Sequence, residues 1–359
     1  MLNSSTITTA TKKQFQLLTY NTWLIHSLLP GENPPYKSER VKGFLQQLQD
    51  SQHPIYDFIF FQELHRFGNV WPFLHFDHSP YEEMKSGIEK IYDYQVVESK
   101  APFPCCLDSG LMIVSKYRVV TCRNYVFKNT TWRSYVTAKG VLYALVDVSS
   151  STTTTTTLSS TTTNSRTNAI SQKNNSNTLN HNNHETRENV NHDSKSNGVR
   201  KSINRDNKTI HNQNLLHLFN SHMEAFDEKK RRLQIQEMVQ FIKECVKPYC
   251  EKTSENSPPK IIIAGDFNID SIRDEMYGEM MHLLNKEIGP VKDVFGVHNN
   301  NDTSKHPSTF GGNLCLDHVL VSDNFKEMSY EIVNWTHTME QQQRIIPLSD
   351  HSGVKVTLQ

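Results

Sequence analysis

The sequence predicts an α/β protein in which two β-sheets pack together and helices lie on the outside. Apolar segments of strand length alternate along the chain with segments of helical periodicity. Some strand segments are apolar throughout, as expected of a sheet covered on both faces, whereas others are half polar. The 359 residues are enough for one large α/β domain or two smaller ones.

The expected strands are apolar runs that end in turn residues. In chain order they are residues 15–21, 56–63, 110–116, 140–148, 215–222, 260–266 and 316–322, and a last strand follows residue 351. The run Ile261, Ile262, Ile263 is the plainest example, and it leads directly into Gly-Asp-Phe-Asn. A turn is the simplest interpretation of those four residues, so the remaining motifs must decide between a turn and a site.

Helices are expected between the strands. Residues 37–49 carry apolar side chains on one side, and residues 227–246 carry them at helical spacing opposite a basic face. The apolar positions are Val41, Phe44, Leu45 and Leu48 in the first helix and Ile235, Met238, Val239, Ile242 and Val246 in the second.

A change of composition interrupts the chain. Residues 149–214 pass from a Ser/Thr run into an Asn-rich tract with almost no aromatic residues. Such a segment buries too little apolar surface to offset the entropy of ordering it, so we expect a disordered insert. We therefore predict a disordered N-terminus at residues 1–12 and one domain, residues 13–359, which the insert at 149–214 interrupts between neighbouring strands.

The composition indicates a soluble, cytoplasmic protein. Lys plus Arg and Asp plus Glu both number 38, so the formal net charge is zero, and we expect no stable nucleic-acid partner. Six scattered cysteines are too few for a disulfide scaffold. The first residues lack the features of a signal peptide, and no stretch approaches the roughly 18 apolar residues of a membrane span.

Residues that could bind a metal or move a proton stand at the ends of the expected strands. They are Asn21, Glu63, His222, Asp266, Asn268, Asp317, Asp350 and His351. Each alone could be a turn cap or a polar strand end in solvent. Together they form an oxygen-rich set with two histidines where strands meet loops, which is where α/β folds place their sites.

These residue types predict Mg²⁺-assisted hydrolysis of a phosphate ester. Carboxylate and amide oxygens suit Mg²⁺, which commonly bridges a carboxylate to a substrate phosphate. A Zn²⁺ site would require clustered Cys and His, which the chain lacks. A histidine backed by a carboxylate is the usual base that deprotonates water near neutral pH.

The motifs around these residues resemble those of the endonuclease/exonuclease/phosphatase superfamily. In order they are TYNTW, FFQEL, SGLMIVSKY, NSHMEAFDEKKRRLQIQEM, GDFN, LDHVLVS and LSDH. The resemblance spans the chain except the insert and implies a four-layered sandwich of two packed mixed β-sheets flanked by helices. YVFKNTTWRSYVTAKGVLYALV and HPSTFGGNLCLDHVLVS are most similar to the neutral and bacterial sphingomyelinases, which are phospholipase C-type enzymes of sphingolipid metabolism.

The resemblance implies a metal site and a general base. Glu63 would hold the Mg²⁺, with Asn21 beside it and Asp350 close to the same cluster. His351 would be the general base, and Asp317 would orient it.

The resemblance also implies how a substrate is held. Asp266 and Asn268 would position the attacking water and a phosphate oxygen. His222 would bind the phosphoryl group or protonate the leaving ceramide oxygen. The implied reaction is the hydrolysis of sphingomyelin, or a related phospholipid, to ceramide and phosphocholine, at a membrane that the protein contacts peripherally.

The sequence departs from the sphingomyelinase pattern in places. The family's Leu-Asp-Tyr is Leu316-Asp317-His318 here. The lipid-entering hairpin of the secreted bacterial enzymes is rich in Trp and Phe, whereas this chain has Trp335 and a Gln-rich middle. We therefore expect membrane contact to be weaker or built elsewhere.

Other classes of function stay open. A nuclease or another phosphoesterase of the same superfamily is the first alternative, although CLDH and the zero net charge disfavour a deoxyribonuclease. The second is a scaffold that kept the fold without catalysis. Lipid and plasmid substrates would separate these classes.

Overall fold

The computed structural model describes residues 13–25, 34–50, 56–66, 79–91, 94–100, 107–131, 137–149, 214–250 and 258–359. Residues 1–12 and 150–213, where we expect disorder, lie outside the described residues. The division into one interrupted domain therefore stays a prediction.

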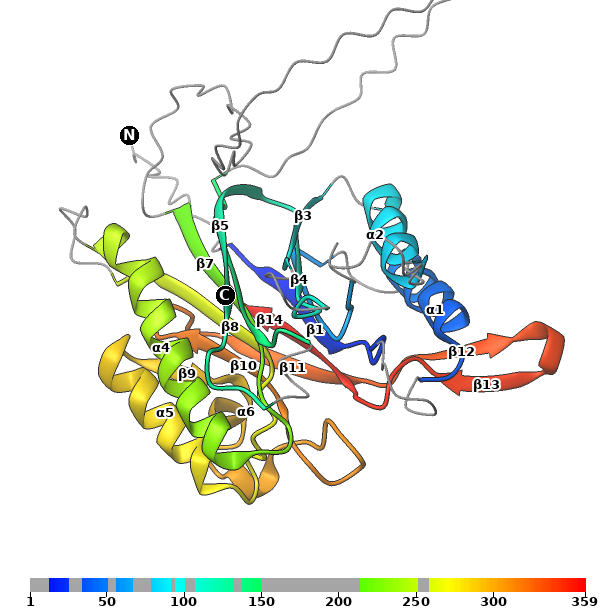
Figure 1. Cartoon of the computed structure of the whole chain (residues 1–359). Helices are drawn as coiled ribbons and strands as arrows, with labels where there is room; N and C mark the ends of the chain where they lie inside the picture. The colour runs from blue at the N-terminus through cyan, green and yellow to red at the C-terminus, as the bar shows by residue number, and fades with distance from the viewer. Residues whose placement is uncertain are drawn as a thin grey trace, which may run out of the picture. The chain divides into compact units, whose positions relative to one another are not determined.

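Two mixed sheets, each of six strands, pack against one another (Figure 1). In spatial order, the first consists of β11 (Met328–Val333), β14 (Gly353–Leu358), β1 (Phe15–Asn21), β2 (Phe58–Gln62), β4 (Met112–Ser115) and β3 (Gln95–Glu98). The second consists of β5 (Arg118–Val126), β6 (Gly140–Asp147), β7 (Leu215–His222), β8 (Lys260–Asp266), β10 (Asp317–Ser322) and β9 (Val291–Asp293). The pairs β1–β2 and β7–β8 are parallel, and the other pairs are antiparallel.

Alternate side chains of the central strands pack into different layers. In β8, Ile262 and Ala264 pack between the sheets, whereas Ile261 and Ile263 pack under helices. A strand buried on both faces needs apolar residues throughout. The triple-isoleucine run is therefore explained by its central place in the second sheet.

Helices cover the outer face of each sheet. The helices α1 (Lys37–Gln49) and α2 (Ser79–Ile91) cover the first sheet, and α4 (Glu228–Cys250) and α5 (Glu275–Glu287) cover the second. The short α6 (Val294–His298) follows β9, and single 3₁₀ turns lie at η2 (Thr303–Lys305) and η3 (Glu340–Gln342). This is the four-layered α/β sandwich that the sequence predicts. In the part of the chain that the structure describes, none of the helices has the length and apolarity needed to cross a membrane.

The strand register brings the predicted site residues to one end of the two sheets. In the second sheet, Asp266 is opposite Asp317 on one side and opposite His222 on the other. In the first sheet, Asn21 ends β1 beside Gln62, which ends β2. Gln62 Nε2 donates to Asn220 Oδ1 at 2.8 Å, so a buried amide pair also links the two sheets at this end.

Gly265 allows β7 and β8 to approach closely at the site. Its φ is +143°, and a Cβ atom there would lie 2.0 Å from the carbonyl oxygen of Ser221. Phe267 is fully buried beyond it, so Asp266 and Asn268 diverge from an aromatic that packs inward.

A two-stranded hairpin of β12 (Thr336–Met339) and β13 (Arg344–Pro347) precedes the last strand and projects from the domain in Figure 1. Trp335 at its base is buried, with its ring 5.3 Å from that of Tyr20. The tryptophan therefore belongs to the core rather than to the tip of the hairpin.

Candidate active site

A buried histidine–aspartate pair forms one side of the site. His351 Nδ1 lies 2.8 Å from Asp317 Oδ2. Burial alone lowers the pKa of His351, but the charges of Asp317 and Asp266 raise it to about 10. The carboxylate therefore fixes the imidazole with its Nε2 atom directed away from Asp317, toward Asp266.

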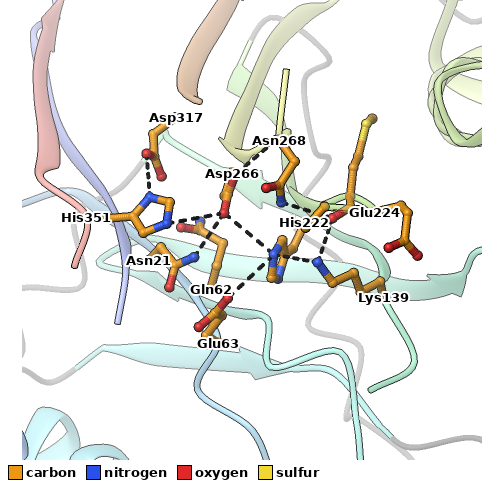
Figure 2. Close-up of polar contacts among 12 residues, drawn as sticks. Asn21, Gln62, Glu63, Lys139, His222, Glu224, Asp266, Asn268, Asp317 and His351 are labelled. Carbon is orange, nitrogen blue, oxygen red and sulfur yellow. Dashed lines mark hydrogen bonds and ion pairs between the residues drawn. The ribbon is translucent and has the colours of Figure 1, made fainter. Parts of the chain in front are cut away.

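Asp266 is the centre of the site (Figure 2). Its Oδ2 accepts a hydrogen bond from Asn21 Nδ2 at 3.0 Å, and its Oδ1 accepts one from the backbone N–H of Asn268 at 2.9 Å. The same Oδ2 lies 3.7 Å from His351 Nε2 and 3.5 Å from His222 Nε2. One carboxylate thus contacts groups from both sheets.

The other side of the site consists of His222, Glu63 and Lys139. His222 Nε2 lies 3.7 Å from Glu63 Oε1 and 2.9 Å from Lys139 Nζ. An ammonium can only donate, so the imidazole Nε2 accepts and the ring proton is on Nδ1. Burial, and next the charge of Lys139, hold the pKa of His222 well below its usual value, which leaves the imidazole neutral.

The Nδ1 atom of His222 is buried and has no hydrogen-bond partner among the described residues. A buried donor without a partner is unusual and calls for an explanation. A bound ligand or water is one such partner.

Two of the site residues have left-handed backbone. The φ angles are +57° for Glu63, which directly follows β2, and +52° for Asn268. Such conformations are uncommon outside glycine and persist where the surroundings enforce them. Asn268 Nδ2 donates to the carbonyl oxygen of Met223 at 3.1 Å, which holds that turn against the end of β7.

The structure brings most of the predicted residues together. Contacts through Asp266 and His222 join Asn21, Glu63, His222, Asp266, Asn268, Asp317 and His351. Asp350 makes none of these contacts. It is exposed, and its Oδ1 accepts a hydrogen bond from Ser349 Oγ at 3.3 Å. Partial desolvation, assisted by Glu63 and opposed by His351, raises the pKa of Asp350 to about 6.

The donor set fits a divalent cation. Among the described residues, ligand atoms of Glu63, His222 and Asp266 all lie within 4.8 Å of one another, as do those of Asp266, Asp317 and His351. Glu63 and Asp266 supply the carboxylate oxygens that Mg²⁺ prefers. Asp350 is in neither set.

Comparisons with known proteins find one matching family model and several solved structures of similar fold. Residues 251–351 match the model of the Endonuclease/Exonuclease/phosphatase family. A beta toxin from Staphylococcus aureus, whose structure holds bound magnesium ions, is 15% identical, with a TM-score of 0.56 over 96% of this chain and 99% of the toxin. No curated protein matches the sequence.

Other solved structures share the fold over the same extent. Sphingomyelinase C from Streptomyces griseocarneus is 14% identical, with a TM-score of 0.54 over 97% of this chain and all of that one. Truncated TDP2 from Caenorhabditis elegans is 11% identical, with a TM-score of 0.51 over 96% and 97%.

The family match covers residues 251–351, and the described residues have the same fold as these solved structures. The low identities leave the substrate to be argued from the site.

Lys139 is a residue of the site that the sequence patterns did not indicate. Its Nζ donates to the carbonyl oxygen of Met223 at 2.7 Å in addition to contacting His222. Burial lowers its pKa, whereas Asp266 and Glu63 act in the opposite direction. The feature of the sequence that could have indicated Lys139 is its place directly before the strand β6. In the structure, the first residue of that strand, Gly140, is opposite His222.

Thr309 and Phe310 support the His351–Asp317 pair. Thr309 Oγ1 accepts from the backbone N–H of Asp317 at 3.1 Å, and the Phe310 ring lies 4.6 Å from the ring of His351. These contacts explain the Ser-Thr-aromatic stretch that resembles the sphingomyelinases.

His318, the departure from Leu-Asp-Tyr, is fully buried. Its Nδ1 lies 3.1 Å from Asp293 Oδ2, and its Nε2 lies 3.1 Å from the carbonyl oxygens of Ile269 and Cys315. Because all these partners are acceptors, both ring nitrogens must donate, and His318 is an imidazolium paired with a buried carboxylate. It also stacks on Phe267, with ring centroids 5.7 Å apart.

Proposed function

We propose that the protein is a Mg²⁺-dependent phosphodiesterase that hydrolyses sphingomyelin, or a closely related phospholipid, to ceramide and phosphocholine. The observation that carries the proposal is the place of Asp266. It lies between a histidine–aspartate base on one side and a group of His222, Lys139 and Glu63 on the other. A phosphodiester between these groups would have a base on one face and cationic and neutral donors on the other.

Glu63, Asp266 and Asn21 are the residues that would hold the Mg²⁺, with Asp350 near them. When bound, the ion would polarise a phosphoryl oxygen and lower the pKa of an attacking water. The Glu63–His222–Asp266 set, whose ligand atoms lie within 4.8 Å of one another, supports a bound ion here.

His351 is the proposed general base. It would accept a proton from water at Nε2, while Asp317 holds Nδ1–H and stabilises the imidazolium that forms. A general base must first be neutral, and the charges of Asp317 and Asp266 raise the pKa of His351. The positive charge of a metal ion held beside Asp266 would lower the pKa of His351 and favour the neutral imidazole.

His222 and Lys139 are proposed to stabilise the phosphoryl group. Lys139 would donate to a phosphoryl oxygen, and His222 would bind the phosphoryl group or protonate the leaving alkoxide through Nε2, the ring nitrogen that faces Asp266 and Glu63. Asn268 would position a phosphoryl oxygen through its side-chain amide. Fixed donors in a buried site stabilise developing charge more strongly than water does.

The choice of a sphingolipid rests on two kinds of support. The quoted motifs resemble the sphingomyelinases, and one of the solved structures with the same fold is a sphingomyelinase C. Trp335 is buried, so a lipid contact at the hairpin would depend on aliphatic side chains such as Ile345, which is 67% exposed. We propose a cytoplasmic enzyme that contacts its membrane peripherally.

A substrate panel tests the proposal. The purified protein would be incubated with Mg²⁺ and sphingomyelin, phosphatidylcholine, lysophosphatidylcholine or an inositol sphingolipid in mixed micelles, and with supercoiled plasmid. We expect release of phosphocholine from sphingomyelin that is lost in His351→Ala. Rapid nicking of the plasmid without lipid turnover would identify a nuclease instead, and turnover of neither substrate would contradict catalysis.

A further inference from the structure

Arg40 is a buried cation that the proposed chemistry does not use. It lies in the first turn of α1 and is 1% exposed. Among the residues that the structure describes, no carboxylate lies within ion-pair distance of it. Its guanidinium instead donates to three carbonyl oxygens, those of Leu348 at 2.7 Å, Trp23 at 3.0 Å and Thr22, and it lies 4.8 Å from the Trp23 ring.

These carbonyls belong to the segments that carry the proposed metal ligands. Thr22 and Trp23 directly follow Asn21, and Leu348 lies two residues before Asp350. The segment of Glu63 is held by the segment of Asn21. The Thr22 N–H and hydroxyl both donate at 2.9 Å to the carbonyl oxygen of Gln62, which precedes Glu63. One guanidinium thereby joins three chain segments that are remote in sequence.

The backbone of two of these segments needs such support. Trp23 and Glu63 have φ angles of +49° and +57°. Residues other than glycine keep this conformation where their surroundings hold it. The hydrogen bond from Arg40 to the Trp23 carbonyl fixes the peptide that leaves the first of these positions.

The charge of Arg40 is balanced by the carboxylates of Asp350 and Glu63. Burial lowers its pKa to about 10, and the opposing effects come first from Asp350 and then from Glu63. A buried charge is tolerated when charges of opposite sign and hydrogen bonds compensate it. Conversely, a fixed positive charge reduces the repulsion between two carboxylates that lie near each other.

We propose that Arg40 is a positioning residue of the metal site. It holds Asn21 and Glu63 in their ligating arrangement, with Asp350 near them, before the ion binds, and its charge reduces the repulsion between the Glu63 and Asp350 carboxylates. Arg40 itself contacts neither the substrate nor the ion. The inference rests on the proposed metal-dependent function. It adds that Arg40 orders the ligand residues in the metal-free protein.

The test compares the Mg²⁺ response of the wild-type protein with that of Arg40→Lys. Lysine keeps the charge, but a single ammonium cannot replace a planar fork that reaches three carbonyls. Mg²⁺ affinity is measured by calorimetry and by the rise of Tm with added Mg²⁺. We expect Arg40→Lys to need about tenfold more Mg²⁺, because losing a supporting contact weakens metal binding by this order. Saturating Mg²⁺ should restore most of kcat, with KM unchanged.

Arg118→Lys is the matched control. Arg118 is half-exposed and pairs with Asp147 at 3.4 Å at the far end of β6. Its substitution should leave the Mg²⁺ response unchanged. If Arg40→Lys does not fold, Trp23→Leu removes the ring against the guanidinium while keeping the carbonyl bonds, and Mg²⁺ affinity should fall by about threefold.

The outcomes separate this inference from the proposed function. A lower Tm of Arg40→Lys with an unchanged Mg²⁺ affinity would overturn the positioning role alone, as would an unchanged affinity in Trp23→Leu if that variant is needed. If the wild-type protein does not bind Mg²⁺, the metal-dependent function is wrong, and the inference is overturned with it.

Discussion

His351 and Asp317 join the two sheets of the domain through a hydrogen bond of 2.8 Å between Nδ1 and Oδ2, across 34 positions of sequence. Asp317 begins β10 in the second sheet, and His351 lies just before β14 in the first. A proton-transfer pair divided between two sheets has the correct geometry only when the sheets are correctly packed.

Asp317→Asn should abolish most of the activity without unfolding the protein. The amide is nearly isosteric but does not stabilise an imidazolium, so kcat should fall by about 10³–10⁴-fold. In the same variant the pKa of His351, followed by NMR, should fall below about 10, since the largest raising charge is gone while that of Asp266 stays. An unchanged pKa with normal kcat would contradict the pairing.

Lys139→Met should lower kcat while leaving KM for the lipid within a small factor. The partly buried ammonium is placed to stabilise charge that develops in the transition state, and the loss of one such donor typically lowers the rate by about 10²–10³-fold. Lys116→Met, which changes a partly exposed lysine beside Asp57, is the control. Equal rates for both variants would exclude Lys139 from the chemistry.

Glu63→Gln should weaken metal dependence rather than folding. A neutral amide is a poorer ligand for Mg²⁺ than a carboxylate, so half-maximal activity should require at least about tenfold more Mg²⁺. Chelation should remove the wild-type activity, and added Mg²⁺ should restore it. Activity that persists after complete chelation would show that no metal is needed.

The buried His318–Asp293 pair should make stability depend on pH. Burial alone lowers the pKa of His318, but its pairing with Asp293 raises that pKa above 6.5. Burial alone raises the pKa of Asp293, but the hydrogen bonds that the carboxylate accepts lower that pKa below 3.8. The histidine therefore contributes stability below about pH 6.5 that is lost as pH rises through its higher folded pKa. The aspartate contributes stability above about pH 3.8 that is lost as pH falls through its lower folded pKa.

His318→Gln tests this dependence. It should cost about 3–5 kcal/mol near pH 5, because one partner of a buried pair is left alone. The difference from the wild-type protein, measured by urea unfolding, should shrink at pH 9 or above. A difference that is the same at both pH values would mean that His318 is not charged.

The central strands could be predicted from sequence because they are buried on both faces. β1, β7 and β8 have the expected bounds, since each supplies apolar side chains to two core clusters, one on either face. β5, by contrast, was not expected. Its residues, including Arg123 and Asn124, are mostly exposed, because the strand lies at the edge of its sheet and lacks a strong apolar pattern.

Site residues could be predicted where they end an apolar strand within a motif. Lys139 could not, because its significance is its 2.9 Å contact with His222, which is 83 positions away. The pairing of His318 with Asp293 was equally hidden, since a changed aromatic position does not reveal which carboxylate it meets. Helix α4 also extends to Cys250 past Pro248, beyond the expected end at residue 246.

The antiparallel ribbon of β6 and β7 has the site at one end and a long connection at the other. Gly140 is opposite His222, and Asp147 is opposite Leu215. Each strand has 8 residues, so the two ends are about 25 Å apart. The described residues that flank the connection therefore join the ribbon at the end remote from the reacting groups.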